Sequence, residues 1–240
     1  MNAMKKNFIS VIIPTYNEKE NIAILIPRIF SSLENNAMRG EVIVVDDGSP
    51  DGTADTADDL GKKYDVKVLR RPRKEGLSSA VIAGFEKAEG DVIGVIDADI
   101  SHPPEEIPRM ARPIMDGSTD ITVASRYIAG GGVENWPLKR RIISNGARAL
   151  ARPITGLKDP LSGFFFFRKS VIEGKNLNPA GYKIGLEVIV KSGSNRVAEI
   201  PYIFHDRKFG SSKLGMKQHF EYLMHLARLY WHKAVTCTKN

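Results

Sequence analysis

Residues 91–106 read DVIGVIDADISHPPEE, and this stretch decides the fold class. The nearly continuous apolar run 92–96 is typical of a strand buried on both faces of a parallel sheet, and the prolines and acids of 103–106 predict the start of a helix. Asp97 and Asp99 follow the strand, at the edge where open α/β sheets bind ligands. Hard divalent cations are commonly held by one or two carboxylates plus substrate phosphates. The sequence therefore predicts a metal site here, with an ordinary surface turn as the alternative.

Composition bounds the rest of the interpretation. The 240 residues suffice for one large α/β domain, and 42% hydrophobic and 26% charged residues are ordinary for a globular protein. The lone Cys237 excludes an internal disulfide and is expected in a reducing compartment. No apolar run approaches the ~20 residues of a membrane-spanning helix, and we expect no signal peptide. The net charge of +7 is concentrated in clusters that suit phosphates, at 70–74, 139–152 and 207–213.

Strands and helices alternate along the first ~125 residues, which predicts a mostly parallel sheet with right-handed crossovers. Strands are expected at 8–13, 41–45, 66–69, 92–96 and 121–124, with helices at 21–33 (broken or kinked at Pro27), after Thr53, at 77–88 and at 105–115. The pattern then changes. A glycine-rich loop at 127–136 precedes a helix at 138–150, a strand at 164–168, a helix at 184–191, a strand at 197–204 and an amphipathic helix at 214–233.

Three polar segments each follow a predicted parallel strand, so they should meet at one edge of the sheet. They are PTYNE (14–18), VVDDGSPDGT (44–53) and DAD (97–99). Acid after the second strand is where Rossmann-like sites bind a ribose or base. The glycine fingerprint for a pyrophosphate is absent from the first turn, which argues against NAD and leaves a diphosphate to be held through a metal. A solvent turn with a helix cap is the alternative for 46–52.

Together with Ser125-Arg126-Tyr127, these motifs resemble the family 2 glycosyltransferases of the GT-A fold. Downstream motifs are similar to the dolichol-phosphate (polyprenol-phosphate) mannosyltransferase branch: GGGVENWPLKRRIISNGA (130–147), DPLSGFFFFRK (159–169), GYKIGLEV (181–188) and HDRKFGSSKLG (205–215). The resemblance implies an α/β, Rossmann-like GT-A domain, a mostly parallel sheet flanked by helices, with a C-terminal acceptor-side subregion. It would be one domain, 1–240, with a nucleotide-sugar half (about 8–125), an acceptor and phosphate half (126–213) and a C-terminal amphipathic helix (214–240).

The resemblance also implies roles for single residues. The nucleoside pocket would be lined by Pro14, Tyr16, Glu18, Val45, Asp46 and Asp47. The diphosphate would be approached by Asp97, Ala98 and Asp99, and neutralised by Arg126, Arg207 and Lys213. Asp99 would be the principal metal ligand, together with Asp97. The third position would be Ser101, where some relatives carry Gln. Because a serine side chain is shorter than that of Gln, a water can take its place on the metal. Asp99, Arg126 and Arg207 would be catalytic, and Arg140 and Ser144 would hold the acceptor phosphate.

The residues themselves support part of this assignment. In a helix over 138–150, Arg140, Ser144 and Arg148 lie at i, i+4 and i+8 on one face, and we expect the opposite face (Ile142, Ile143, Ala147, Leu150) to be buried. Guanidinium groups bind phosphate well, although a solvated basic face is equally compatible with this spacing. The loop 205–213 would act as a closing phosphate clamp, with an ordinary loop as the alternative. Structural roles are preferred for His102 and His205.

The activity implied by the resemblance is transfer of mannose from GDP-mannose to dolichyl or polyprenyl phosphate, with inversion and with Mg²⁺ or Mn²⁺. Such an enzyme would be peripheral, on the cytoplasmic side of a membrane, with a possible anchoring subunit or segment. The apolar stripe of the last helix would rest on the membrane surface or, alternatively, pack on the core: Met216, Phe220, Leu223, Ala227 and Tyr230, with Trp231 beside it.

Other functions remain open at this point. A UDP-sugar donor, for example for glucose transfer to a polyprenyl phosphate, would use the same fold and metal site. Nucleic-acid binding is disfavoured, because aromatic residues are not interleaved with the basic clusters along the sequence. A catalytically silent homologue is disfavoured by the complete set of metal-binding and arginine residues.

Overall fold

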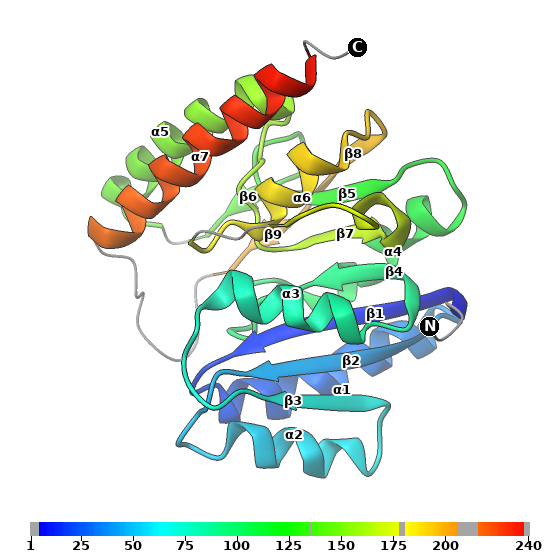
Figure 1. The fold of residues 1–240 in the computed structure, drawn as a ribbon. Coiled ribbons are helices and arrows are strands. Elements are labelled where there is room, and N and C mark those ends of the chain that lie inside the picture. The colour runs from blue at the N-terminus through cyan, green and yellow to red at the C-terminus, as the bar shows by residue number, and fades with distance from the viewer. Residues whose placement is uncertain (1–4, 135, 178–180, 206–215, 238–240) are drawn as a thin grey trace.

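The computed structural model describes residues 5–134, 136–177, 181–205 and 216–237. A seven-stranded sheet in the order β3-β2-β1-β4-β7-β5-β8 forms the centre of the molecule (Figure 1). Its strands are β1 (Lys5–Thr15), β2 (Arg39–Asp46), β3 (Val66–Arg70), β4 (Gly90–Val95), β5 (Ile121–Ser125), β7 (Phe165–Arg168) and β8 (Val197–Pro201). A separate two-stranded sheet pairs β6 (Gly132–Val133) with β9 (Ile203–Phe204). The predicted α/β class and mostly parallel sheet are confirmed.

The helices are α1 (Lys19–Asn35), α2 (Thr53–Gly61), α3 (Leu77–Lys87), α4 (Ile107–Met115), α5 (Leu138–Thr155), α6 (Ile184–Ser192) and α7 (Met216–Cys237), with short 3-10 turns at Pro104–Glu106 and Lys169–Ile172. The predicted break at Pro27 is wrong, because α1 continues through that residue. The helix predicted from 138 ends at Thr155 rather than Leu150. Within the described ranges, no helix combines the length and apolarity that crossing a bilayer takes.

Strand β7 departs from the parallel pattern, since it lies antiparallel between β4 and β5. The strand and the residue before it supply four consecutive buried phenylalanines, Phe164 to Phe167, and successive side chains of an extended chain point to opposite faces. Phe164 and Phe166 therefore pack with α1 and α4, whereas Phe165 and Phe167 pack with α3 and α6. Gly94 faces Phe166 across the β4–β7 pair, where a Cβ would lie 2.2 Å from the ring. This strand thus fills both layers of the core.

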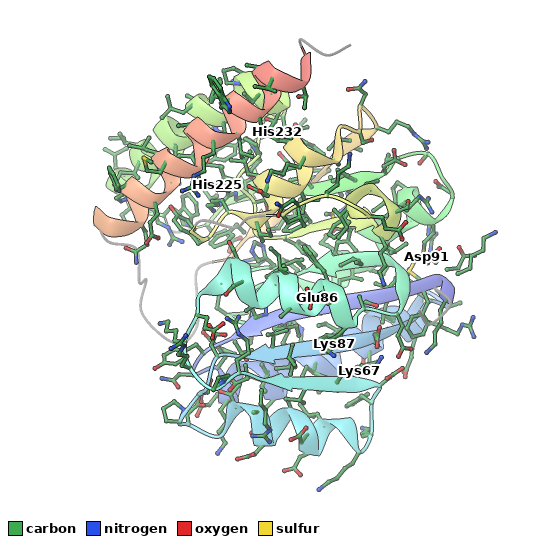
Figure 2. The ribbon with its side chains drawn as sticks, viewed as in Figure 1. Lys67, Glu86, Lys87, Asp91, His225 and His232 are labelled. Atoms are coloured by element: carbon green, nitrogen blue, oxygen red, sulfur yellow. The ribbon has the colours of Figure 1, made fainter. Side chains whose placement is uncertain are left out.

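Helices α5 and α7 lie side by side beyond the sheet (Figure 1) and form a third hydrophobic cluster with α6. The inward residues of α7 are Tyr222, Leu226 and Leu229. On the same side of α7, His225 (labelled in Figure 2) places Nε2 2.6 Å from Oε2 of Glu187 on α6, and both side chains are buried. Lys191 contacts the other oxygen of Glu187 at 2.5 Å. An apolar cluster and a buried hydrogen bond between His225 and Glu187 therefore fix α7 to α6.

Candidate active site

Three strands deliver polar side chains to one edge of the sheet, as the sequence predicts. The last residues of β1 and β2 pair, Thr15 with Asp46, and the hydroxyl of Thr15 donates to Oδ1 of Asp46 at 3.1 Å. On the other side of β1, Ile96 follows β4 and extends its pairing with β1, because its N–H donates to the carbonyl of Ile12. Segments 14–18, 46–53 and 97–99 consequently leave the sheet at the same side, which puts the motifs within reach of one ligand.

The two acids at the end of β2 are held by two different segments. Asp46 is buried and accepts hydrogen bonds from the N–H and the hydroxyl of Ser49, at 2.9 and 2.5 Å. Asp47 is buried too; its Oδ2 accepts the backbone N–H groups of Glu75 and Gly76, and its Oδ1 lies 3.0 Å from a terminal nitrogen of Arg71. Asp47 therefore ties the second strand end to the segment before α3, a partner that no spacing in the sequence indicated.

The other residues expected around the nucleoside are placed as follows. Tyr16 is half-buried, and the ammonium group of Lys74 lies 4.1 Å from its ring centroid. Glu18 accepts a hydrogen bond from the side-chain amide of Asn21 at 2.7 Å. Pro14 is half-buried, whereas the side chain of Val45 is fully enclosed in the core. Val45 therefore presents no exposed surface to a nucleoside in this structure.

Asp97 and Asp99 differ in their exposure. The side chain of Asp97 is 35% exposed, and its Oδ2 lies 3.3 Å from Nε2 of the buried His102. A Cβ at Gly163 would lie 2.7 Å from the same oxygen, so the glycine keeps the space beside the carboxylate clear. Asp99 is buried and accepts both the N–H and the hydroxyl of Ser101, the latter at 2.5 Å. The backbone of Ala98 between them is buried. Asp97 is therefore the more accessible carboxylate of the pair.

This donor set fits a divalent cation that a substrate helps to hold. Among the residues that the structure describes, no group of three or more His, Cys, Asp or Glu could bind a metal by itself. Two carboxylates at a strand end, with oxygen ligands completed by phosphates, is nevertheless the ordinary arrangement for Mg²⁺. The serine hydroxyl at Ser101 points to Asp99 and orients that carboxylate. Ligation by Asp97, Asp99 or Ser101 stays a prediction.

Arg126, directly after β5, is held by a carboxylate that sequence reasoning missed. Its Nε and one terminal nitrogen donate to Asp159 at 2.7 and 2.8 Å, and its backbone N–H donates to the same group. Asp159, the first residue of the 159–169 motif, is fully buried and accepts the hydrogen bond from the backbone N–H of Arg126. Burial alone would lower the pKa of Arg126, but the hydrogen bonds and charge of Asp159 outweigh burial and raise that pKa. The guanidinium is thus a fixed cation at the site.

Lys183, at the start of α6, is a second cation that was missed. Its ammonium group donates to the carbonyl of Leu161 at 2.7 Å. Burial, followed by the charge of Arg126, lowers the pKa of Lys183 to about 8, against the attraction of Asp97 and Asp159. Lys183 therefore lies within electrostatic range of both the predicted metal ligand and the Arg126–Asp159 pair. The only signal in the sequence was its place in the 181–188 motif.

The basic face of α5 turns toward the same region. Arg140 lies over the ring of Trp136 at 4.3 Å, Ser144 places its hydroxyl 3.2 Å from the phenol of Tyr127, and Arg148 lies 3.9 Å from the Tyr127 centroid. The helical spacing thus predicted a shared face. The predicted burial of the opposite face is wrong: Ile142, Ile143 and Leu150 are exposed, and only Ala147 packs against the cluster of α5, α6 and α7.

Two further expectations have defined outcomes. His102 is buried among the rings of Phe164, Tyr202 and Phe204, as a residue with a structural role would be. Aromatic residues that the sequence does not interleave with the basic clusters meet arginines in the fold, where Arg126 approaches Tyr127, Trp136 and Phe204. The buried Trp136 and Phe204 are not open stacking platforms for bases, however. Arg207 and Lys213, with the rest of the predicted clamp after His205, lie outside the described residues.

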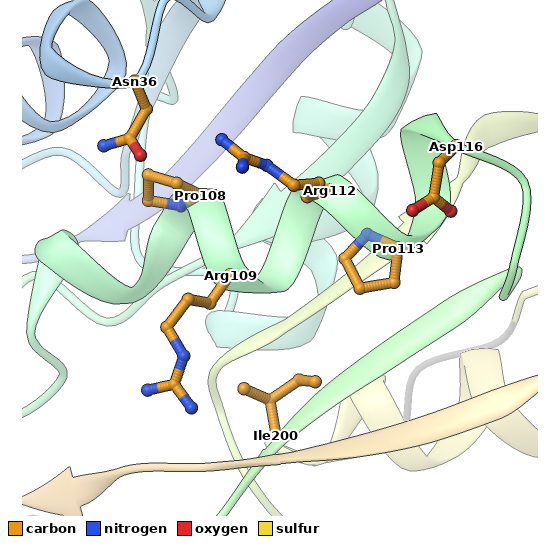
Figure 3. A pocket seen from close by; sticks show the side chains of 7 residues that line it. All are labelled: Asn36, Pro108, Arg109, Arg112, Pro113, Asp116 and Ile200. Carbon is orange, nitrogen blue, oxygen red and sulfur yellow. The ribbon is translucent and has the colours of Figure 1, made fainter.

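A hollow of about 350 Å³ lies elsewhere, along the outer side of α4 (Figure 3). Its lining includes Asn36 after α1, Arg109 and Arg112 on α4, and Ile200 on β8. Arg109 pairs with Glu106 at 2.6 Å. None of the predicted site residues lines this hollow, so we do not connect it with the strand-end site.

The site can now be compared with known proteins. Residues 10–174 match the family described as glycosyl transferase family 2. The dolichol-phosphate mannosyltransferase of Pyrococcus furiosus is 51% identical over 92% of this chain; the matched part is 63% of that protein, so the chain spans less than two thirds of its length. The dolichol-phosphate mannosyltransferase of Saccharomyces cerevisiae is 40% identical over 92% of this chain and 86% of its own.

Solved structures agree on the fold. Glucosyl-3-phosphoglycerate synthase from Mycobacterium tuberculosis, in complex with Mn²⁺, UDP-glucose and phosphoglyceric acid, superposes with a TM-score of 0.69 over 95% of this chain and 79% of that one, at 18% identity. At this identity the likeness concerns architecture alone. The family match and the two sequence relatives go further: this chain belongs to the family 2 glycosyltransferases, in the group of the dolichol-phosphate mannosyltransferases.

Proposed function

We propose that the protein transfers mannose from GDP-mannose to the phosphate of dolichol or another polyprenol, with inversion at the anomeric carbon. One observation carries the proposal: the carboxylates after β4, the fixed cation after β5 and the basic face of α5 share one side of the sheet. His102 connects the first two: its Nε2 lies 3.3 Å from Asp97, and its ring lies 5.5 Å from the ring of Phe204, which the guanidinium of Arg126 approaches at 5.7 Å. The names of the relatives at 40% and 51% identity supply the sugar and the acceptor.

The chemistry requires little acid–base work from the protein. A phosphate monoester has a second pKa near 6, so the acceptor arrives as an anion and needs no general base. The residues must instead hold two anions close together and stabilise the charge that develops on the leaving nucleoside diphosphate. Asp97 and Asp99 would hold a divalent metal, Mg²⁺ or Mn²⁺, which supplies Lewis-acid stabilisation of that charge.

Arg126 contributes to this task in a restricted way. A guanidinium carries five N–H donors. Asp159 accepts one hydrogen bond from Nε and one from a terminal nitrogen of Arg126. The proposal therefore assigns phosphate contact to the other terminal nitrogen of Arg126. Asp159 keeps the group in one orientation, which favours a fixed electrostatic environment over a mobile one. Arg140 and Ser144 would bind the acceptor phosphate, and Arg207 and Lys213 would add to the donor side.

The proposal also includes contact with a membrane surface, because a polyprenyl phosphate resides in one. Large apolar side chains of α5 and α7 are exposed side by side, among them Leu138, Ile142, Phe220, Leu223 and Trp231. Exposed arginines Arg141, Arg152 and Arg228 accompany them. An apolar helix face with flanking cations is the ordinary form of an interfacial membrane contact.

The test is a thermal-shift panel followed by a turnover assay. A ligand that binds only the folded state raises the melting temperature. We expect GDP and GDP-mannose with Mn²⁺ to raise it, and EDTA to remove the shift. Turnover of GDP-mannose with farnesyl phosphate should fall at least 100-fold in Asp99→Ala, because a metal contributes several kcal/mol to the barrier. Asp59→Ala, on the exposed side of α2, is the matched control.

The outcomes are distinct. Stabilisation by UDP or UDP-glucose alone would replace the donor assignment while leaving the fold and the metal site. Activity of Asp99→Ala near that of the wild type, with intact folding, would contradict the metal assignment. No turnover with farnesyl phosphate, despite a shift with GDP-mannose, would contradict the acceptor class.

A further inference from the structure

Three arginines and two aromatic residues alternate in one continuous stack beside the site. Arg148 lies over Tyr127 at 3.9 Å, and Arg126 lies 5.5 Å from the same ring. Arg126 is also 5.2 Å from the Trp136 ring, and Arg140 is 4.3 Å from it. The members come from the end of β5, the loop before α5 and α5 itself, so only the fold assembles them.

Trp136 occupies the decisive place in this stack. Trp136 is 8% exposed, and its indole contacts both the arginine assigned to the donor diphosphate and the arginine assigned to the acceptor phosphate. Phe204 supports it edge-on, with ring centroids 5.3 Å apart, and also approaches both guanidinium groups. One indole therefore touches a cation of each substrate site.

The electrostatics explain why an indole suits this place. Two guanidinium groups held near one another repel, and Asp159 compensates Arg126 through a bidentate contact. The face of an indole is negative, so it attracts cations, and indole is the strongest aromatic partner for them. A leucine is smaller and has no aromatic face, so it would fill only part of the same space and attract neither arginine.

The reaction gives this spacing a purpose. The acceptor phosphate must approach a sugar that is still bonded to a diphosphate, so two anionic groups have to be held at a small and fixed separation. Cations that can drift apart would bind each anion separately but would not keep them aligned. The separation of Arg126 from Arg140 is therefore a quantity that affects the rate as well as binding.

We propose that Trp136 is a positioning residue that holds Arg140 at a fixed separation from Arg126, and thereby sets the acceptor phosphate against the donor diphosphate. The inference rests on the proposed function, since it assumes that these two arginines bind the two substrates. Trp136 itself touches neither substrate in this scheme. Arg126 keeps Asp159 as a second anchor, so loss of the indole affects the acceptor side more than the donor side.

The experiment compares Trp136→Leu, Trp136→Phe and wild type in steady-state turnover of GDP-mannose and farnesyl phosphate with Mn²⁺. We expect Trp136→Leu to raise the KM for farnesyl phosphate and lower kcat, each on the order of tenfold, from the loss of buried cation–π contacts. The KM for GDP-mannose should change less than about threefold, and Trp136→Phe should recover most of the loss because a phenyl ring still attracts cations.

A matched control separates positioning from general packing. Tyr64→Leu removes a stacked pair with Phe30, whose centroids are 4.8 Å apart, from the opposite end of the sheet. It should lower the melting temperature and leave both KM values unchanged. If Trp136→Leu likewise alters stability alone, or raises both KM values equally with no recovery in Trp136→Phe, the inference is overturned. Absence of turnover by the wild-type protein would instead overturn the proposed function.

A second measurement decides the case if Trp136→Leu does not fold. The chain has two tryptophans, so Trp231→Phe leaves Trp136 as the single indole emitter. We expect its emission to change on titration with farnesyl phosphate in the presence of GDP and Mn²⁺, because a phosphate bound to Arg140 alters the charge over the ring. An emission spectrum that does not respond, although turnover proceeds, overturns the inference.

Discussion

At the scale of single residues, the acids that the sequence singled out divide into two kinds. Asp46, Asp47 and Asp99 are buried and accept hydrogen bonds from backbone N–H groups, those of Asp46 and Asp99 from their own loops and that of Asp47 from the segment before α3, so all three help to shape the strand ends. Asp97 alone among these four keeps a partly exposed side chain, beside the space left by Gly163. A carboxylate that folds a loop and one that meets a ligand look alike in a sequence, because both follow a strand.

The buried pair of Arg126 and Asp159 gives a prediction at this scale. Asp159→Ala leaves a guanidinium without its partner in a site from which water is largely excluded, and we expect the free energy of unfolding to fall by about 3–5 kcal/mol. Urea denaturation measures it, with the exposed Asp59→Ala as the control that should hardly change stability. A loss as small as that of the control would mean that Asp159 does not hold Arg126.

At the scale of elements, α5 and α7 each carry two apolar stripes. The inward stripe includes Ala151 and Ile154 of α5 and Tyr222, Leu226 and Leu229 of α7. The outward stripe of α7 is the apolar stripe that the sequence predicted. Its members Phe220, Leu223, Ala227 and Tyr230, and Trp231 beside them, are exposed. The alternative that this stripe packs on the core is therefore wrong for these five residues.

The outward stripe predicts binding to lipid vesicles. Each large apolar side chain that enters a membrane contributes roughly 1.5–3 kcal/mol, so a Phe220→Ser/Trp231→Ser variant should bind vesicles at least tenfold more weakly. Co-sedimentation with vesicles containing acidic lipids measures this, with Ile24→Ser on the exposed side of α1 as the control. Turnover of detergent-dispersed farnesyl phosphate should persist. Equal vesicle binding by both variants would contradict the membrane assignment.

At the scale of the whole molecule, the two ends of the sheet have opposite tasks. The carboxyl ends of the parallel strands carry the candidate site, whereas charged pairs close the amino ends. There, the buried Glu41 accepts hydrogen bonds from Ser10 and from the N–H of Glu89, and pairs with Lys67 at 2.6 Å. Glu89 in turn contacts Lys5 at 2.7 Å and also Lys67. This network connects the first four strands of the chain.

The network predicts a pH dependence of stability. Hydrogen bonds from Lys5 and then Lys67 lower the pKa of Glu89 from 4.5 to about 2. Because the folded pKa is the lower one, the unfolded chain takes up the proton first; the stabilisation is complete above about pH 4.5 and is lost as the pH falls toward 2. Glu89→Gln should therefore unfold at lower urea than wild type at pH 7, and the difference should vanish near pH 2. A difference independent of pH would contradict this account.

The sequence by itself determined the fold class, the edge of the sheet at which the polar motifs meet and the basic face of α5. These follow from periods of two and 3.6 residues and from where polar motifs interrupt apolar runs, which are local properties. Only the tertiary structure decided the antiparallel insertion of β7, the pairing of Asp159 with Arg126, the place of Lys183 and the stack around Trp136. Each of these rests on hydrogen bonds or ring contacts, which depend on distance in space, and no local spacing specifies that distance.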